Sequence, residues 1–192
     1  MKTLLLTCCF VFGLFNTTVG QNYGQLTATD AITGSERTLA SLVTEKGIVL
    51  IFHDTSCPFA NLYEERIKTL RSKFQSQGIA FALVNPQAST SAEDQSRLRA
   101  HIDMTGLNMP YLIDDKQAWT KLLTATKIPE VLVLVPGKET LEVVYKGAID
   151  NNAQAENAVT EKYLERALTQ LLRGEKPSPS QVRAVGCNIR TY

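Results

Sequence analysis

Residues 47–66, GIVLIFHDTSCPFANLYEER, predict a buried strand followed by a single cysteine and then a helix. The apolar run at 49–52 is typical of a central strand that is buried on both faces. Pro58 fits the first turn of a helix, because that position has no intrahelical use for an N–H. We therefore expect Cys57 just beyond the strand, at the start of a helix that runs to about Gln77. Unpaired amides and the helix dipole favour the thiolate there.

The start of the chain predicts export. Its 192 residues, 44% of them hydrophobic, suit one globular domain with a sizeable core. Lys2, the apolar run at 4–15 and the polar segment that ends at Gly20 match the three regions of a secretory signal peptide. The run is shorter than the roughly 20 residues that span a bilayer, so we expect cleavage after Gly20 and no membrane span in the mature chain. The protein would then be periplasmic or extracellular.

Charge and cysteine count both change when residues 1–20 are removed. Lys2 is lost and no acid is, so 20 basic residues become 19 against 19 acidic ones. A mature chain with zero formal charge gives no reason to expect nucleic acid or an anionic membrane as a partner. The cut also removes two of the four cysteines and leaves Cys57 and Cys187. In a compartment that permits disulfides, two remaining cysteines favour pairing.

Strands and helices alternate along the rest of the chain. Further strands are expected at 25–31, 79–84, 109–114, 131–135 and 141–147, and helices at 89–104, 115–124 and 156–172. The first of these helices would open within 89–93, with Thr90 or Ser91 as its cap. A strand, a helix and a strand over 49–84 imply a right-handed parallel crossover. The predicted fold class is therefore α/β, with a central mixed, mostly parallel sheet flanked by helices. This domain would span 21–174, and the Pro- and Ser-rich stretch at 175–192 would form an extended tail that carries Cys187.

Several motifs in this order resemble the thioredoxin fold over roughly residues 24–174. They are the strand-Cys-Pro-helix unit at 49–77, the Ile128-Pro129 step before a buried strand, the Pro-Gly turn at 136–137, and Lys146-Gly147 before the last helix. Cys-Pro-Phe at 57–59 and the terminal Gly-Cys-Asn-Ile-Arg at 186–190 look similar to an exported peroxiredoxin-like branch of the redoxin group. That group also contains the alkyl hydroperoxide reductase and thiol-specific antioxidant proteins.

The resemblance implies a redox site around Cys57. In thioredoxin-like proteins the proline that faces the active cysteine is cis, and Pro129 occupies that place. Cys57 would be the attacking thiolate, partly exposed, and Pro58, Ile128, Pro129 and Gly147 would bind a thiol or disulfide of a protein or of a small molecule. No organic cofactor is implied, because a partner protein or small thiol would supply the electrons.

The partner of Cys57 is left open by the sequence. A dithiol thioredoxin carries C-x-x-C, but Ala60 stands in the second position here, so we consider Cys187 as a distant resolving cysteine. The alternative is a permanent disulfide, which would stabilise the fold by up to roughly 5 kcal/mol by closing a long loop. A thiol peroxidase that uses Cys57, and a non-enzymatic binding or scaffold module, are the competing functions.

The histidines and one acidic turn complete the candidate residues. His53 could favour the thiolate of Cys57 or join Cys57 and Cys187 in a soft-metal site, but a polar residue at a strand end is the preferred interpretation. We therefore predict no metal site. His101 is expected to be solvated. The segment 150–152 could line the mouth of the site near Gly147, although its composition first of all indicates a turn.

Overall fold

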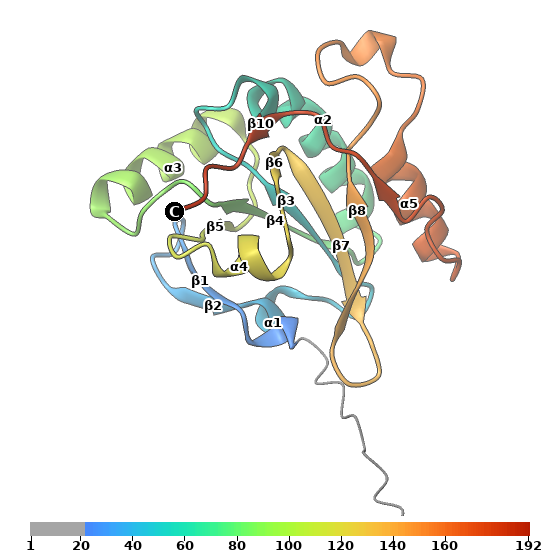
Figure 1. Ribbon diagram of the computed structural model, residues 1–192, viewed down its shortest axis with the longest axis horizontal. Helices are drawn as coiled ribbons and strands as arrows, with labels where there is room; N and C mark the ends of the chain where they lie inside the picture. The colour runs from blue at the N-terminus through green and yellow to red at the C-terminus, as the bar shows by residue number, and fades with distance from the viewer. Residues whose placement is uncertain (1–21) are drawn as a thin grey trace, which may run out of the picture.

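The computed structural model describes residues 22–192. The signal peptide predicted for residues 1–20 lies outside this range. An eight-stranded sheet forms the centre of the molecule, and helices cover both of its faces (Figure 1). Within 22–192, no helix combines the length and apolar character needed to cross a membrane.

The strands follow the spatial order β2-β1-β5-β4-β3-β7-β8-β9. Their bounds are Thr27–Asp30 (β1), Glu36–Thr38 (β2), Ile48–Phe52 (β3), Ala80–Asn85 (β4), Tyr111–Ile113 (β5), Glu130–Pro136 (β7), Leu141–Gly147 (β8) and Gln181–Val182 (β9). A second, two-stranded sheet pairs β6 (Lys127–Ile128) with β10 (Cys187–Asn188). The helices are Leu39–Leu42 (α1), Pro58–Gln75 (α2), Ala92–Thr105 (α3), Ala118–Leu122 (α4) and Tyr163–Leu172 (α5), with 3-10 turns at Tyr23–Gln25 (η1) and Glu156–Ala158 (η2).

The central sheet is mixed, as predicted. Parallel pairing joins β3 to β4, β4 to β5 and β8 to β9, and the other neighbours in the sheet are antiparallel. Fewer strand pairs are therefore parallel than the predicted, mostly parallel sheet would contain. The reason is that β7 runs against β3 and returns through a hairpin into β8. The parallel β3–α2–β4 crossover follows the prediction.

Strand β3 is buried on both faces, which explains its uninterrupted apolar sequence. Val49 and Ile51 pack into the core that α2, α3 and α5 cover. The other three residues of β3 pack into the core on the opposite face, which includes residues of α1 and α4. All five side chains have zero exposed surface, as the apolar run predicts for a central strand.

Local signals place the starts of α2 and α3 correctly. Cys57 is the N-cap of α2 and Pro58 its first residue. Ser91 caps α3, and its side chain accepts a hydrogen bond from the Asp94 amide at 3.2 Å. Such a bond satisfies an amide that has no partner inside the helix. Helix α2 ends slightly earlier than expected, at Gln75.

The helix predicted over 156–172 is wrong in its first half. Residues 156–158 form the 3-10 turn η2, and α5 begins only at Tyr163. Asn151 explains this, because its Oδ1 accepts hydrogen bonds from the amides of Thr160 and Glu161 at 3.0 and 3.1 Å. These amides are held by a side chain nine and ten residues earlier in the chain, so the segment before α5 stays non-helical.

A buried ion pair attaches the loop after β8 to α2. Arg66 Nη1 lies 2.7 Å from Asp150 Oδ2, and both side chains are less than 10% exposed. Tyr63 Oη donates a hydrogen bond to the other carboxylate oxygen of Asp150 at 2.8 Å, and Arg66 also donates to the carbonyl of Asn152 at 2.7 Å. Asp150 therefore ties the turn that follows Gly147 to α2, the long helix that Cys57 caps.

Candidate redox site

Cys57 lies where the sequence predicts it, between β3 and α2. Its amide donates a hydrogen bond to the carbonyl of Asp54 at 3.0 Å, which closes a tight turn after the strand. Its own carbonyl accepts from the amide of Asn61 at 3.2 Å, which starts the helical hydrogen-bond pattern. The sulfur is thus held at the N-terminal end of an 18-residue helix, where the helix dipole stabilises negative charge.

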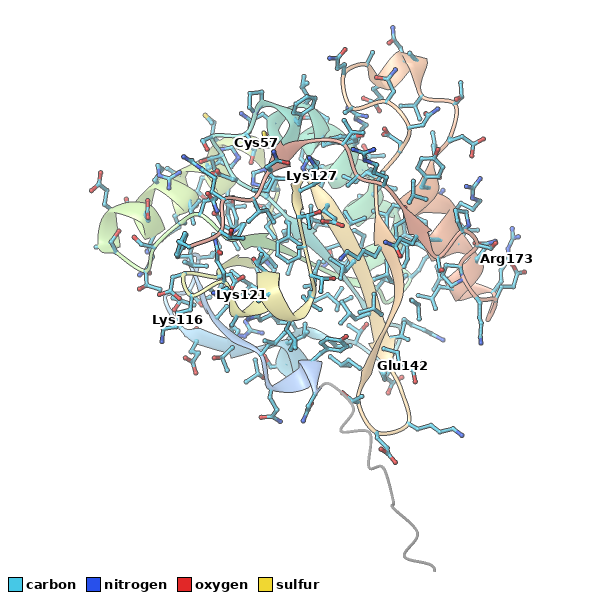
Figure 2. All side chains as sticks on the ribbon, in the orientation of Figure 1. Cys57, Lys116, Lys121, Lys127, Glu142 and Arg173 are labelled. Carbon is cyan, nitrogen blue, oxygen red and sulfur yellow. A yellow bond between two sulfur atoms is a disulfide. The ribbon has the colours of Figure 1, made fainter. Side chains whose placement is uncertain are left out.

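Cys57 forms a disulfide with Cys187, 130 residues further along the chain, with the two Cα atoms 6.1 Å apart. Strand β10 brings Cys187 there, because it pairs antiparallel with β6 and places Cys187 opposite Ile128. Cys57 Sγ also lies 3.2 Å from the carbonyl oxygen of Ile128. The Ile128–Pro129 peptide bond is cis. The structure therefore assembles both cysteines beside the Ile128-Pro129 step. Figure 2 labels Cys57 close to Lys127, the residue that precedes this step.

The expectation that Cys57 is partly exposed is wrong for this oxidised form. Its exposed fraction is 3%, because the disulfide and the C-terminal segment cover it. A cavity of about 170 Å³ reaches both cysteines and is also lined by Asp54, Gln87 and Arg190. This small cavity offers a reagent a route toward the sulfurs.

Two glycines allow the C-terminal segment to lie against the domain. A Cβ on Gly147, which has φ +136°, would overlap the backbone of Val182 in β9. A Cβ on Gly186 would overlap the carbonyl of Ile128. The space beside Gly147, predicted to serve a substrate, is thus filled by the chain's own β9 in this form.

Hydrogen bonds and one apolar side chain hold the last residues of the chain. The carbonyl of Arg190 accepts from the side-chain amides of Gln87 and Gln117 at 2.9 and 2.7 Å. The amide of Ile189 donates to the carbonyl of Thr126 at 3.1 Å, and its side chain is 8% exposed within the core. The segment predicted to be an extended tail is therefore docked along the β6 edge of the site.

Glu130, which was not among the residues predicted for the site, shapes the backbone just before this edge. The residue is 6% exposed, and its Oε2 accepts hydrogen bonds from the amides of Thr126 and Lys127 at 2.7 and 3.2 Å. Lys146 Nζ lies 3.9 Å from the other oxygen. Its position at the start of an apolar strand could have identified Glu130 from the sequence, because a buried acid needs hydrogen-bond or charged partners.

We expect Glu130→Ala to lower the free energy of unfolding by about 1.5–3 kcal/mol, because it leaves two amides without their charged acceptor. Glu142→Ala is the matched control, since Glu142 is exposed on neighbouring β8, and should change stability by less than about 0.5 kcal/mol. Urea unfolding of both variants measures the difference. Equal stability of the two variants would contradict the role given to Glu130.

The two histidines follow the predicted positions in the chain but are more buried than expected. His53 is fully buried, and His101 is largely covered, with 12% of its side chain exposed. Both face Glu64 of α2, whose Oε1 is 2.6 Å from His101 Nε2 and 3.4 Å from His53 Nε2. His101 is thus not simply solvated, and His53 is not a surface loop residue, because α2 and α3 close over the end of β3. The cysteines bond to each other instead of joining His53.

Comparison with known proteins agrees with this architecture. The sequence profile of the AhpC/TSA family matches residues 19–151, so the chain belongs to that family. No curated protein matches it. The matched range contains Cys57, Ile128, Pro129 and Gly147, and Cys187 lies beyond it.

Solved structures share the fold. An uncharacterized conserved protein from Geobacillus kaustophilus has a TM-score of 0.78 at 22% identity, over 90% of this chain and 92% of that one. A hypothetical protein from Sinorhizobium meliloti has a TM-score of 0.76 at 26% identity, over 91% and 95%. A secreted disulfide oxidoreductase from Mycobacterium tuberculosis has a TM-score of 0.53 at 18% identity, over 78% and 96%. The chain thus has a thioredoxin-like fold of the redoxin group.

Proposed function

We propose that this protein is an exported thiol–disulfide oxidoreductase, with Cys57 as the attacking thiolate and Cys187 as the resolving cysteine. One observation carries the proposal. The Cys57–Cys187 disulfide lies at the start of α2 and against Ile128, and Cys187 is presented there by a strand paired with β6. A bond that only pinned the end of the chain would not need to involve the cysteine at a helix N-terminus.

The reaction is a pair of thiol–disulfide exchanges. The Cys57 thiolate attacks one sulfur of a substrate disulfide, which forms a mixed disulfide and releases the first substrate thiolate. The Cys187 thiolate then attacks the Cys57 sulfur, releases the second substrate thiolate and forms the Cys57–Cys187 bond. Two electrons pass from the protein to the substrate. A partner protein or small thiol returns them by the reverse exchange, and no organic cofactor takes part.

The two cysteines have different roles because their surroundings differ. Cys57 caps an 18-residue helix, so the dipole favours its thiolate, whereas Cys187 lies in the two-residue strand β10. The backbone of Ile128 is the edge on which an extended substrate would lie, next to Pro58 and Pro129, and β10 occupies that edge in the oxidised protein. The substrate and the C-terminal segment therefore compete for this edge. When the segment docks again, it brings Cys187 to the mixed disulfide between Cys57 and the substrate.

Export is part of the proposal. It is supported by the three-part pattern of residues 1–20 and by the pairing of the two cysteines that would remain after cleavage. A solved structure with the same fold is a secreted disulfide oxidoreductase. Detection of the protein in a periplasmic or culture fraction, with a mature N-terminus near Gln21, tests this point; a full-length protein retained inside the cell would contradict it.

Reduction of insulin disulfides by the reduced protein tests the reaction. We expect turnover in the wild type and only the uncatalysed rate in Cys57→Ser, because the nucleophile is lost. Cys187→Ser should still attack once and then accumulate a covalent mixed disulfide, which mass spectrometry detects. Insulin reduction that is unchanged in Cys57→Ser would rule the proposal out. Absence of turnover in the wild type would instead favour a scaffold with a permanent disulfide.

A thiol peroxidase is the second candidate, and membership of the AhpC/TSA family favours it. The Cys57 thiolate would attack a peroxide oxygen and become a sulfenic acid, and the remaining oxygen would leave as water or an alcohol. Cys187 would then condense with the sulfenic acid to give the disulfide and water. Peroxide consumption that depends on Cys57, without insulin reduction, would select this reaction.

A further inference from the structure

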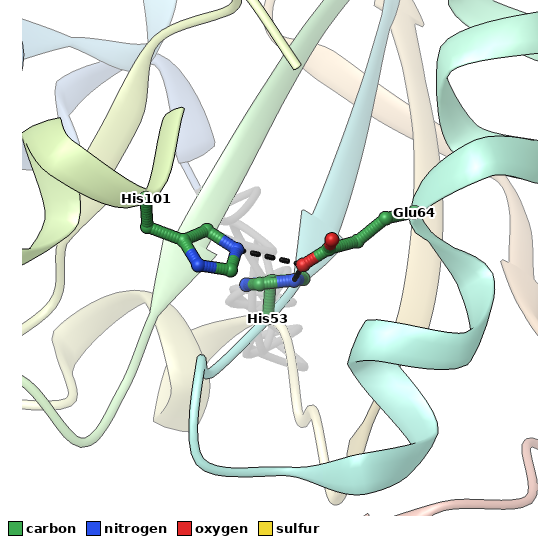
Figure 3. A group of neighbouring side chains, drawn as sticks. All are labelled: His53, Glu64 and His101. Carbon is green, nitrogen blue, oxygen red and sulfur yellow. Dashed lines mark hydrogen bonds and ion pairs between the residues drawn. The ribbon is translucent and has the colours of Figure 1, made fainter. Parts of the chain in front are cut away.

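The structure contains a compact group of metal-ligating side chains away from the disulfide. His53 follows β3, Glu64 lies on α2 and His101 on α3, and Figure 3 shows the three side chains converging. Each offers one ligand atom, and these atoms all lie within 4.8 Å of one another. The chain contains only these two histidines, and the fold brings both to the same carboxylate.

A buried nitrogen that makes no hydrogen bond points into this group. His53 has no exposed surface, and its Nε2 has no hydrogen-bond partner within the described residues. The other ring nitrogen, Nδ1, lies 2.6 Å from Tyr111 Oη, which accepts a hydrogen bond from the side-chain amide of Asn85 at 3.3 Å. An unsatisfied buried polar atom destabilises the fold unless a ligand uses it.

The contact between His53 Nδ1 and Tyr111 is typical of metal-ligating histidines, whose second ring nitrogen usually makes a hydrogen bond that orients the ring. When Nδ1 donates its proton to Tyr111 Oη, the lone pair of Nε2 faces Glu64 and His101. A neutral imidazole with a free lone pair is the form of histidine that binds metals.

The donor set selects the type of ion. Two imidazole nitrogens and one carboxylate oxygen suit Zn²⁺ and neighbouring transition metals, whereas Mg²⁺ and Ca²⁺ prefer oxygen ligands. Bonds of about 2.0–2.2 Å in a tetrahedral site place ligand atoms roughly 3.3 Å apart. The 3.4 Å from His53 Nε2 to Glu64 is close to that value. The 2.6 Å from His101 Nε2 to Glu64 is shorter, so an ion would move these two side chains slightly apart. The side chains of Glu64 and His101 are 13% and 12% exposed, so water can supply a fourth ligand.

We propose that His53, Glu64 and His101 bind one divalent transition-metal ion, with Zn²⁺ as the preferred ion. The ion would join the end of β3 to α2 and α3, and thus hold the helix that Cys57 caps against its neighbours. It would bind the folded protein and not the unfolded chain, so it would raise the melting temperature. The proposal does not depend on turnover at the disulfide.

Titration of Zn²⁺ into the metal-free, oxidised protein tests the proposal by calorimetry. The intact Cys57–Cys187 bond keeps both thiols from acting as ligands. We expect one equivalent to bind, and at least 10-fold weaker binding in Glu64→Gln and in His101→Gln. Glu65→Gln is the matched control, because this neighbouring carboxylate on α2 has a side chain that is 78% exposed, and it should bind as the wild type does.

Two further measurements keep the test decisive. The melting temperature without metal shows that each variant folds, and Zn²⁺ should raise it in the wild type and in Glu65→Gln only. Tyr111→Phe removes the hydroxyl beside His53 Nδ1 and should weaken binding about 10-fold. No binding by the folded wild type, or equal binding by Glu64→Gln and His101→Gln, would overturn the proposal.

Discussion

Loss of the Cys57–Cys187 bond is expected to lower the free energy of unfolding by up to about 5 kcal/mol. The bond joins residues 130 positions apart. In the chain-entropy model, a closed loop of this length removes that much conformational freedom from the unfolded chain. The contacts of the tail, such as that of Ile189 in the core, stabilise the folded state separately from this loop-closure effect.

Urea unfolding of the wild type and of Cys187→Ser measures this effect. Under oxidising conditions the variant should unfold at a clearly lower urea concentration. Under reducing conditions the two proteins should differ by less than about 1 kcal/mol, because neither then contains the bond. If oxidised and reduced wild type unfold together, the loop-closure argument is wrong for this protein.

This stabilisation also bears on the redox chemistry by thermodynamic linkage. A bond that stabilises the folded protein by about 5 kcal/mol is itself harder to reduce, by roughly 100 mV, than the same bond in an unfolded chain. The electron donor that returns the protein to its dithiol form must be correspondingly reducing. Equilibration with glutathione or dithiothreitol buffers measures the potential, and an easily reduced bond would point to tail contacts weaker than those described.

Asp150→Ala is expected to lower the free energy of unfolding by about 3–5 kcal/mol. The substitution leaves the guanidinium of Arg66 buried without its carboxylate and removes the acceptor of Tyr63 Oη. An uncompensated buried charge is among the most destabilising single changes. Burial, followed by the hydrogen bond to Asp150, raises the pKa of Tyr63, so this hydroxyl is a neutral donor throughout the ordinary pH range.

The control for Asp150 is Asp103→Ala on the exposed side of α3, which should change stability by less than about 0.5 kcal/mol. The double variant Arg66→Met and Asp150→Leu should recover part of the loss, because it removes both charges together. An Asp150→Ala protein as stable as Asp103→Ala would show that water, and not the ion pair, satisfies Arg66.

The sequence by itself determined the centre of this protein. The apolar run of β3, the position of Cys57 and the start of α2 at Pro58 follow from local rules, namely burial of consecutive apolar residues and the chemistry of a helix N-terminus. The cap of α3 at Ser91 follows in the same way. The family resemblance added Pro129, whose peptide bond is cis. Each of these features depends on residues close together in the chain.

Only the tertiary structure decided the features that join distant segments. Burial of Cys57 depends on β10 docking on β6, the late start of α5 depends on Asn151, and the metal-ligating group needs His53 and His101 to meet across α2. Neighbouring residues carry no signal of these contacts, because their free energy comes from hydrogen bonds and buried surface that exist only once the sheet and helices have packed.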